Sequence, residues 1–169
     1  MVKKWNVTIP KLSGDKPRRA YICLPESYEK NKDKRYPVMY MFDGHNVFLD
    51  EDATYGKSWG MKKYMDLSKK QLIIVAVECN HIGNSRLQEY TPFTFENATL
   101  GKIKAKGKVY MHWLINTLKP YIDENYRTLP DRTNTIICGS SMGGLMALYA
   151  AVHYNRWFSK AACVSTAMG

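Results

Sequence analysis

The junction between residues 135 and 154 constrains the fold of this chain more than any other segment. A short run rich in β-branched residues, 135–138, meets Gly-Ser-Ser-Met-Gly-Gly and then an apolar run that continues to Tyr154. The first run is typical of a buried strand, and the second is typical of a helix that is apolar on nearly all sides. Because Gly139 and Gly143 stand two residues before and after Ser141, the backbone can turn tightly there. The segment therefore predicts a strand, a sharp turn with Ser141 at its tip, and a helix.

Other apolar runs extend this unit to an α/β fold. Continuous apolar runs predict strands that are buried on both faces, as in a parallel sheet covered by helices on each side. Apolar residues at helical spacing between 111 and 122 predict a helix, in which Pro120 should cause a kink or start a new turn. The expected parallel strands are 37–42, 72–77, 135–138 and 161–164, and residues 4–9 and 19–24 are expected to form a hairpin. We therefore predict a mostly parallel sheet flanked by helices, in a single domain that spans residues 1–169.

Composition excludes several function classes. The net charge is +10, but the lysines are dispersed, and their one cluster, residues 102–108, has no interleaved aromatic residues. We therefore expect a solvated basic surface and no nucleic-acid partner. No apolar run reaches the length of about 18 residues that a membrane span needs, so no membrane partner is expected.

Cysteine usage and the first residues of the chain bear on localisation and on metals. The beginning of the chain lacks the apolar core of a signal peptide, and the 4 cysteines are scattered. We therefore expect a cytoplasmic protein with reduced thiols. Cys79-Asn80-His81 resembles a pair of metal ligands, but no second ligand cluster exists in the sequence, so no metal site and no cofactor are predicted.

Residues 79–108 show no sustained periodicity. Loops of this length in a compact domain are usually functional or disordered. Residues 86–92 (RLQEYTP) are too rich in hydrogen-bonding and aromatic groups for a flexible linker. We therefore expect this segment to serve a function.

The serine at the tip of the turn has the setting of a nucleophile. A serine hydroxyl attacks only when a base removes its proton and the group is presented to the substrate. Gly-x-Ser-x-Gly provides that presentation at the carboxyl end of a sheet. The helix that begins at Met142 directs free N–H groups towards a developing oxyanion, so the Met142 N–H is a predicted donor. A phosphate-binding turn is a weaker interpretation, because no lysine follows at the P-loop spacing.

Five segments carry a family resemblance. They are residues 36–44 (YPVMYMFDG), 58–60 (SWG), 86–92 (RLQEYTP), 121–128 (YIDENYRT) and 138–149. With them, nearly the whole chain resembles the "putative esterase" family of the α/β-hydrolase superfamily. This family includes enterobactin and feruloyl esterases, S-formylglutathione hydrolases and mycolyltransferases.

The resemblance implies an α/β-hydrolase fold and roles for several residues. The residue after the Asp-Gly pair, His45, would donate the second oxyanion N–H from its backbone. Residues 86–92 would lie over the site, and a possible substrate pocket would include Trp59, Arg86, Glu89 and Tyr90. Two alternatives remain open: Arg86 and Glu89 could form a structural ion pair, and Trp59 could be a core residue.

The partners of Ser141 are missing from the sequence. In this fold an acid and then a histidine follow the serine along the chain. Residues 142–169 contain no acid, and their only histidine, His153, lies about 18 Å along the helix from its start. A general base must lie within about 3 Å of the proton that it takes. A pair between Ser141 and the His45 side chain is a further alternative.

The sequence therefore favours the N-terminal part of a longer esterase, with a sheet that lacks its C-terminal strands. Strand 161–164 would then be an apolar edge through which a homo-oligomer could form. The predicted function is carboxylic-ester hydrolysis by a serine esterase, through an acyl-enzyme on Ser141, with a small-molecule or glycan ester as substrate. The alternatives are an acyltransferase, which would pass the acyl group to an alcohol or sugar, and a binding module without turnover.

Overall fold

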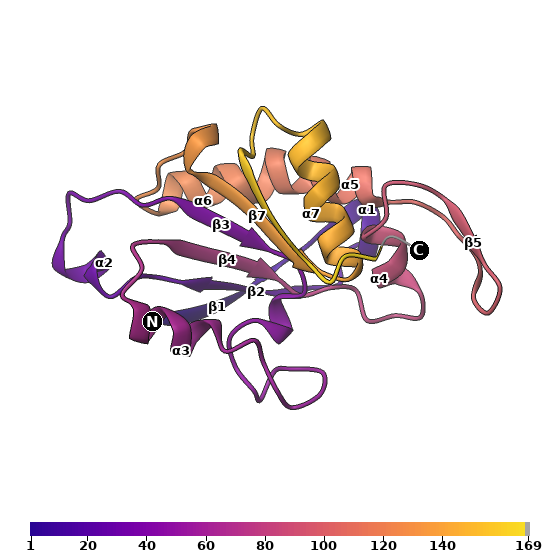
Figure 1. Cartoon of the computed structure of the whole chain (residues 1–169), viewed down its shortest axis with the longest axis horizontal. Helices are drawn as coiled ribbons and strands as arrows, with labels where there is room; N and C mark the ends of the chain where they lie inside the picture. The colour runs from indigo at the N-terminus through magenta and orange to yellow at the C-terminus, as the bar shows by residue number, and fades with distance from the viewer. Residues whose placement is uncertain (168–169) are drawn as a thin grey trace.

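A computed structural model describes residues 1–167, and its centre is a 6-stranded sheet (Figure 1). A separate 2-stranded hairpin stands apart from this sheet. The strands are β1 (Val2–Val7), β2 (Arg18–Cys23), β3 (Val38–Met41), β4 (Ile73–Val77), β5 (Phe95–Asn97), β6 (Gly101–Ile103), β7 (Thr135–Ser140) and β8 (Lys160–Val164).

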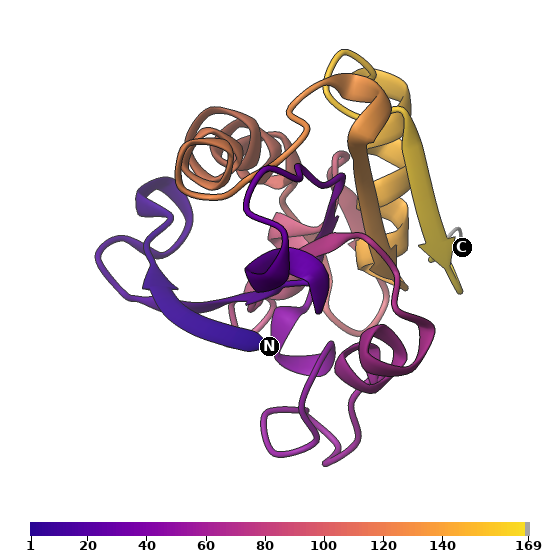
Figure 2. The ribbon, with the colours of Figure 1, turned by 90° about the vertical axis from the view of Figure 1, so that its left-hand side faces the viewer.

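The strand order brings four carboxyl ends to one edge of the sheet. The order is β1-β2-β4-β3-β7-β8, in which β4, β3, β7 and β8 pair in parallel, while β2 runs antiparallel to both of its neighbours, β1 and β4. Val38 lies opposite Ile73 on one side and Thr135 on the other. Figure 2 shows the N-terminal strand and the yellow C-terminal strand at opposite edges of the sheet. The predicted hairpin of β1 with β2 and the mostly parallel sheet are both confirmed.

Helices cover both faces of the sheet. In Figure 1, α5, α6 and α7 lie on one face, and α3 lies on the other. The α-helices are α1 (Pro10–Ser13), α2 (Ser27–Lys30), α3 (Met61–Ser68), α4 (Ser85–Glu89), α5 (Gly107–Trp113), α6 (Lys119–Asn125) and α7 (Met142–His153). Two 3₁₀ turns, η1 (Gly44–Asn46) and η3 (Arg132–Asn134), and a π-helical turn, η2 (Leu114–Leu118), complete the list.

Strand β4 explains why the sheet needs cover on both sides. All of its residues are buried, and they alternate between two apolar clusters. Ile73, Val75 and Val77 pack in the cluster under α5, η2 and α7. Ile74 and Ala76 pack with Phe48, Met65 and other residues on the opposite face. The prediction from its continuous apolar run is therefore correct.

Pro120 behaves as predicted. It lies in the first turn of α6, directly after the π-helical turn η2, so a new helical segment begins there. A residue without an N–H is tolerated in a first turn, because the N–H groups there have no partner within the helix.

Two expectations about elements need correction, and one helix was not predicted. Residues 79–108, which show no periodicity, contain the short helix α4 and the hairpin β5–β6. Helix α3 was not predicted; Met65 is its one buried residue, and its apolar residues Tyr64 and Leu67 are exposed. Helix α7 is not buried all round, since Leu148 is 39% and Val152 59% exposed.

The position of β8 and the character of the helices bear on two further expectations from the sequence. β8 lies at the edge of the sheet, as predicted for strand 161–164, and most of its residues are exposed. Among residues 1–167, no helix has the length and apolar character to cross a bilayer.

Candidate active site

The turn between β7 and α7 places Ser141 at the carboxyl edge of the sheet. Its backbone has φ 55° and ψ −119°, a conformation that residues other than glycine rarely adopt. A Cβ on Gly139 would lie 2.3 Å from the carbonyl oxygen of Gly143, so position 139 has no room for a side chain. The predicted strand, turn and helix are present, and Ser141 is exposed at the tip of the turn.

The C-terminal strand braces this turn. The Ser141 N–H donates to the carbonyl of Val164 at 3.0 Å, and the Ala167 N–H donates to the Ser141 carbonyl at 3.2 Å. The Leu145 N–H donates to the same carbonyl at 3.1 Å and so begins the helical ladder of α7. The unusual backbone of Ser141 is therefore held from both sides.

The segment Asp43-Gly44-His45 lies beside the start of α7. The Phe42 N–H donates to the Cys138 carbonyl at 3.0 Å, which fixes the end of β3 against β7. A Cβ on Gly143 would lie 3.6 Å from Oδ2 of Asp43. A Cβ on Gly44 would lie 2.8 Å from backbone atoms of β4, so only glycine allows this close approach. The Asp-Gly turn and the serine turn are therefore in contact.

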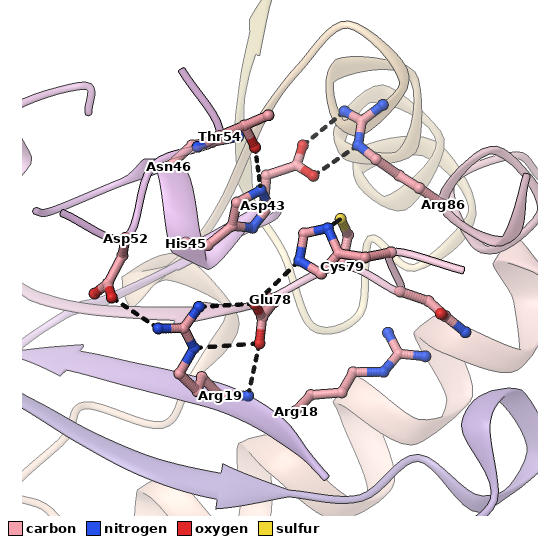
Figure 3. A network of polar contacts seen from close by, with 12 residues as sticks. Arg18, Arg19, Asp43, His45, Asn46, Asp52, Thr54, Glu78, Cys79 and Arg86 are labelled. Carbon is pink, nitrogen blue, oxygen red and sulfur yellow. Dashed lines mark hydrogen bonds and ion pairs between the residues drawn. The ribbon is translucent and has the colours of Figure 1, made fainter. Parts of the chain in front are cut away.

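A bidentate ion pair anchors the Asp-Gly turn. Nε and Nη2 of Arg86 donate to Oδ1 and Oδ2 of Asp43, each at 2.7 Å (Figure 3). The Asp43 side chain is 8% exposed and that of Arg86 is 31% exposed. The hydrogen bonds to Asp43 raise the pKa of Arg86 above its usual range. The Asp43 N–H also donates to the hydroxyl of Tyr90 at 3.1 Å. Arg86 and Tyr90 thus hold the turn through hydrogen bonds with Asp43.

The alternative of an ion pair between Arg86 and Glu89 is wrong. Glu89 instead accepts a hydrogen bond from Nη1 of Arg18 at 2.8 Å and another from the Asn80 N–H at 2.8 Å. Arg18 is buried, so its charge requires a carboxylate nearby. Arg86 and Glu89 therefore serve different partners.

Two residues of the expected pocket are corrected by their burial. Glu89 is 1% exposed and Tyr90 is 0% exposed, so neither side chain offers a surface to a substrate. Arg86 is partly exposed, and Trp59 is 41% exposed, which excludes the alternative of a core tryptophan. The Trp59 N–H donates to the Asn46 carbonyl at 2.8 Å, so Trp59 lies next to the chain that follows His45. A pocket role for Trp59 and Arg86 stays a prediction.

His45 is buried, and its ring makes contacts away from Ser141. Nε2 lies 3.1 Å from Oγ1 of Thr54, and the ring meets that of His81 edge-on with centroids 4.6 Å apart. Burial lowers the pKa of His45. Within residues 1–167, no hydrogen bond joins His45 to Ser141, so the alternative of a Ser141–His45 pair finds no contact to support it.

Two backbone N–H groups at the junction of the turns are free. Across the described part of the chain, neither the His45 N–H nor the Met142 N–H has an acceptor. His153 lies at the other end of α7, whose 12 residues span about 18 Å, and its ring packs on Tyr149. The arrangement offers a presented hydroxyl and two donors, and within residues 1–167 no hydrogen bond joins that hydroxyl to a histidine.

The family is shown by a comparison over most of the chain. Residues 13–168 match the family described as "Putative esterase". The chain belongs to this family. The chain also has the α/β-hydrolase fold of the solved esterases that it resembles, and the sheet order and serine turn described above agree with that fold.

Individual relatives of this esterase-family chain are distant and longer. "Esterase Rv1288" of Mycobacterium tuberculosis is 29% identical over 140 residues, which cover 82% of this chain and 27% of that protein. A solved "ferulic acid esterase" has a TM-score of 0.70 at 26% identity and covers 100% of this chain and 61% of its own. An IroE-like serine hydrolase of Shewanella oneidensis has a TM-score of 0.72 at 21% identity, with 98% and 50% covered. The chain thus spans less than two thirds of each relative.

Sequence reasoning missed the residues that support the site. Asp43 was noted only as part of a turn, although a carboxylate directly after a buried strand signals a need for a cation. A cavity of about 440 Å³ between α1 and α5 was also unforeseen; it is lined by Ile9, Lys11, His112 and Trp113 among others, and by no predicted site residue.

Proposed function

We propose that the chain carries the nucleophile and the oxyanion donors of a carboxylic-ester hydrolase. The observation that carries the proposal is the exposed Ser141, held at φ 55° beside the free N–H groups of His45 and Met142. Strained residues that their surroundings hold in place cluster at active sites. Membership of the esterase family favours this use of the strain over a purely structural one.

The reaction follows from these groups. The Ser141 Oγ attacks the ester carbonyl while its proton passes to a general base, and the carbonyl oxygen becomes an oxyanion that accepts from the His45 and Met142 N–H groups. Collapse breaks the bond to the alcohol, which leaves with the proton from the base, and an acyl-enzyme remains. Water then attacks the acyl group by the same route and releases the acid and Ser141.

The anchored Asp-Gly turn would contribute through preorganisation. Oxyanion donors are effective when they are fixed before the charge develops, because no reorganisation is then needed. The Arg86–Asp43 ion pair holds the segment from which the His45 N–H projects. In this proposal Asp43, Arg86 and Tyr90 are positioning residues and contact no reacting atom.

The general base and its carboxylate are to be sought outside residues 1–169. No acid follows Ser141 in these residues, and His153 is a helix length away. Esters of phenolic acids are the proposed substrate class, because a relative at 26% identity is described as a ferulic acid esterase.

The experiment is p-nitrophenyl acetate hydrolysis by three proteins: the 169-residue chain, the reading frame extended past Gly169, and the extended protein with Ser141→Ala. We expect turnover only in the extended protein with Ser141 intact, and Ser140→Ala is the matched control that keeps activity. Full activity of Ser141→Ala would refute the proposal. Turnover by the 169-residue chain through Ser141 would refute the placement of the base outside it.

A further inference from the structure

Three side chains with metal-binding atoms converge beside the Asp-Gly turn. They are His45, which follows β3, and Cys79 and His81, which follow β4. Because β3 and β4 are parallel neighbours, the segments after them meet at one edge of the sheet. One ligand atom from each side chain lies within 4.8 Å of the other two. The sequence predicted no metal site, because Cys79 and His81 had no further ligand cluster nearby in the chain. In the folded protein His45 supplies a third ligand.

Each imidazole is already oriented by a second hydrogen bond. Nε2 of His81 lies 3.0 Å from Oε1 of Glu78, and its Nδ1 lies 3.8 Å from Sγ of Cys79. Nε2 of His45 lies 3.1 Å from Oγ1 of Thr54. Metal-bound histidines usually use one ring nitrogen for the metal and the other for a carboxylate or a similar partner. Both rings therefore have the orientation of ligands.

His45 provides the observation that contacts within the protein do not explain. The residue is 4% exposed, and its Nδ1 is buried without a hydrogen-bond partner. In Figure 3 the labelled His45 ring lies between Thr54 and Cys79, with its bonded nitrogen towards Thr54. A contact between the Cys79 thiol and the His81 imidazole leaves Nδ1 of His45 without a partner. A buried polar atom without a hydrogen-bond partner calls for an explanation such as a bound ion.

We propose that His45, Cys79 and His81 form a binding site for a zinc ion or a similar transition-metal cation. One thiolate and two imidazoles suit borderline metals, and three protein ligands leave a fourth tetrahedral position for water. Zinc bonds of about 2.3 Å to sulfur and 2.0–2.1 Å to nitrogen place the two ligand atoms about 3.6 Å apart. The Cys79–His81 separation of 3.8 Å is close to that value. Modest shifts of the His45 ring would close the site.

The surroundings of the three ligands bear on how the ion enters the site and on the charges near it. The His81 side chain is 53% exposed, which opens a path from solvent. Burial raises the pKa of Cys79, so the incoming ion displaces the thiol proton into solvent as the metal–sulfur bond forms. The carboxylates of Glu78 and Asp43 lie in chain positions close to these ligands, and they are already paired with Arg19 and Arg86.

This site is independent of the proposed esterase activity. It uses the His45 side chain, whereas the proposed oxyanion donor is the His45 backbone N–H. Metal binding can therefore be measured on the 169-residue chain, whether or not Ser141 is a nucleophile.

The test is titration of the tag-free chain with Co²⁺, followed by competition for Zn²⁺ with a chromophoric chelator. We expect one equivalent of Co²⁺ to produce a sulfur-to-metal charge-transfer band. Loss of a partner outside the ligand shell typically weakens metal binding about 10–100-fold. His81→Ala removes a ligand itself and should therefore weaken Zn²⁺ binding at least about 100-fold. Cys79→Ser should abolish the band, because it removes the sulfur ligand.

Matched controls come from residues of the same type elsewhere in the chain. Cys163 and His153 are exposed and lie on β8 and α7, so Cys163→Ser and His153→Ala should leave the band and the affinity unchanged. The exposed His81→Ala variant remains informative if Cys79→Ser is unstable. Absence of the band in the wild-type chain, or equal losses in the variants and their controls, would overturn the proposal.

Discussion

The ion pair under the Asp-Gly turn gives the sharpest test of how this site is supported. Replacing Arg86 with methionine keeps an unbranched apolar stem and removes the guanidinium with both of its 2.7 Å hydrogen bonds to Asp43. The Asp43 carboxylate, 8% exposed, then remains buried without a cation. Breaking a buried pair in this way costs about 3–5 kcal/mol. Because Arg86 is 31% exposed and water screens part of the interaction, we expect the lower end, about 3 kcal/mol.

The assay is urea and thermal unfolding of the wild-type and Arg86→Met chains. A loss of about 3 kcal/mol corresponds to a fall in melting temperature of about 6–12 °C for a domain of this size. The control is Lys62→Met, which breaks the surface pair with Asp66 on α3 and should cost about 0.3–0.5 kcal/mol.

A double-mutant cycle separates the charge from the packing. Asp43→Asn removes the charge that Arg86→Met leaves unpaired, so the double variant should be more stable than the sum of the two single losses predicts. If Arg86→Met costs no more than Lys62→Met, or if the two losses simply add, the ion pair does not anchor the turn and the reasoning fails.

Three further predictions concern the backbone and one loop. Ser141→Gly should raise the free energy of unfolding by about 1 kcal/mol, because glycine relieves a backbone strain of about 1–3 kcal/mol at φ 55° and loses part of that gain to its greater freedom in the unfolded chain. Ser140→Gly in β7 is the control and should lower the free energy of unfolding. Denaturant unfolding that ranks the two variants in the opposite order would contradict this prediction. Gly139→Ala should lower the melting temperature by several degrees, since its Cβ would meet a carbonyl oxygen at 2.3 Å and overpacking costs about 1–3 kcal/mol; an unchanged value would show that the turn can shift. The Ser58 N–H and hydroxyl hold the pKa of Asp50 at about 2, below its unfolded value, so the stabilisation is complete above about pH 4 and is lost as the pH falls through about 2. The amide resonance of Ser58 should therefore stay unshifted from about pH 5 to 3.5, and a midpoint near 3.9 would refute this.

Some parts of this molecule are determined by local sequence alone. The run Ile73–Val77 is apolar without alternation, so burial on both faces follows from its composition in any arrangement of neighbours. The turn at Ser141 follows from Gly139, whose missing side chain leaves room for the backbone of Gly143. Pro120 sets a new helical segment because its ring fixes φ and removes an N–H. Each of these features depends on residues within a few positions of one another.

The partners of charged and polar side chains were decided by the tertiary structure. Arg86 and Glu89 stand three positions apart and suggest a pair, yet Arg86 binds Asp43 and Glu89 binds Arg18, at sequence separations of 43 and 71 residues. His45 meets Cys79 and His81 only because β3 and β4 are neighbours in the sheet. Periodicity tells which residues are buried, but it does not give the order of strands, because that order depends on how distant segments pack. The sequence by itself therefore predicted the serine turn and its strand, and the sheet order chose the side chains that surround them.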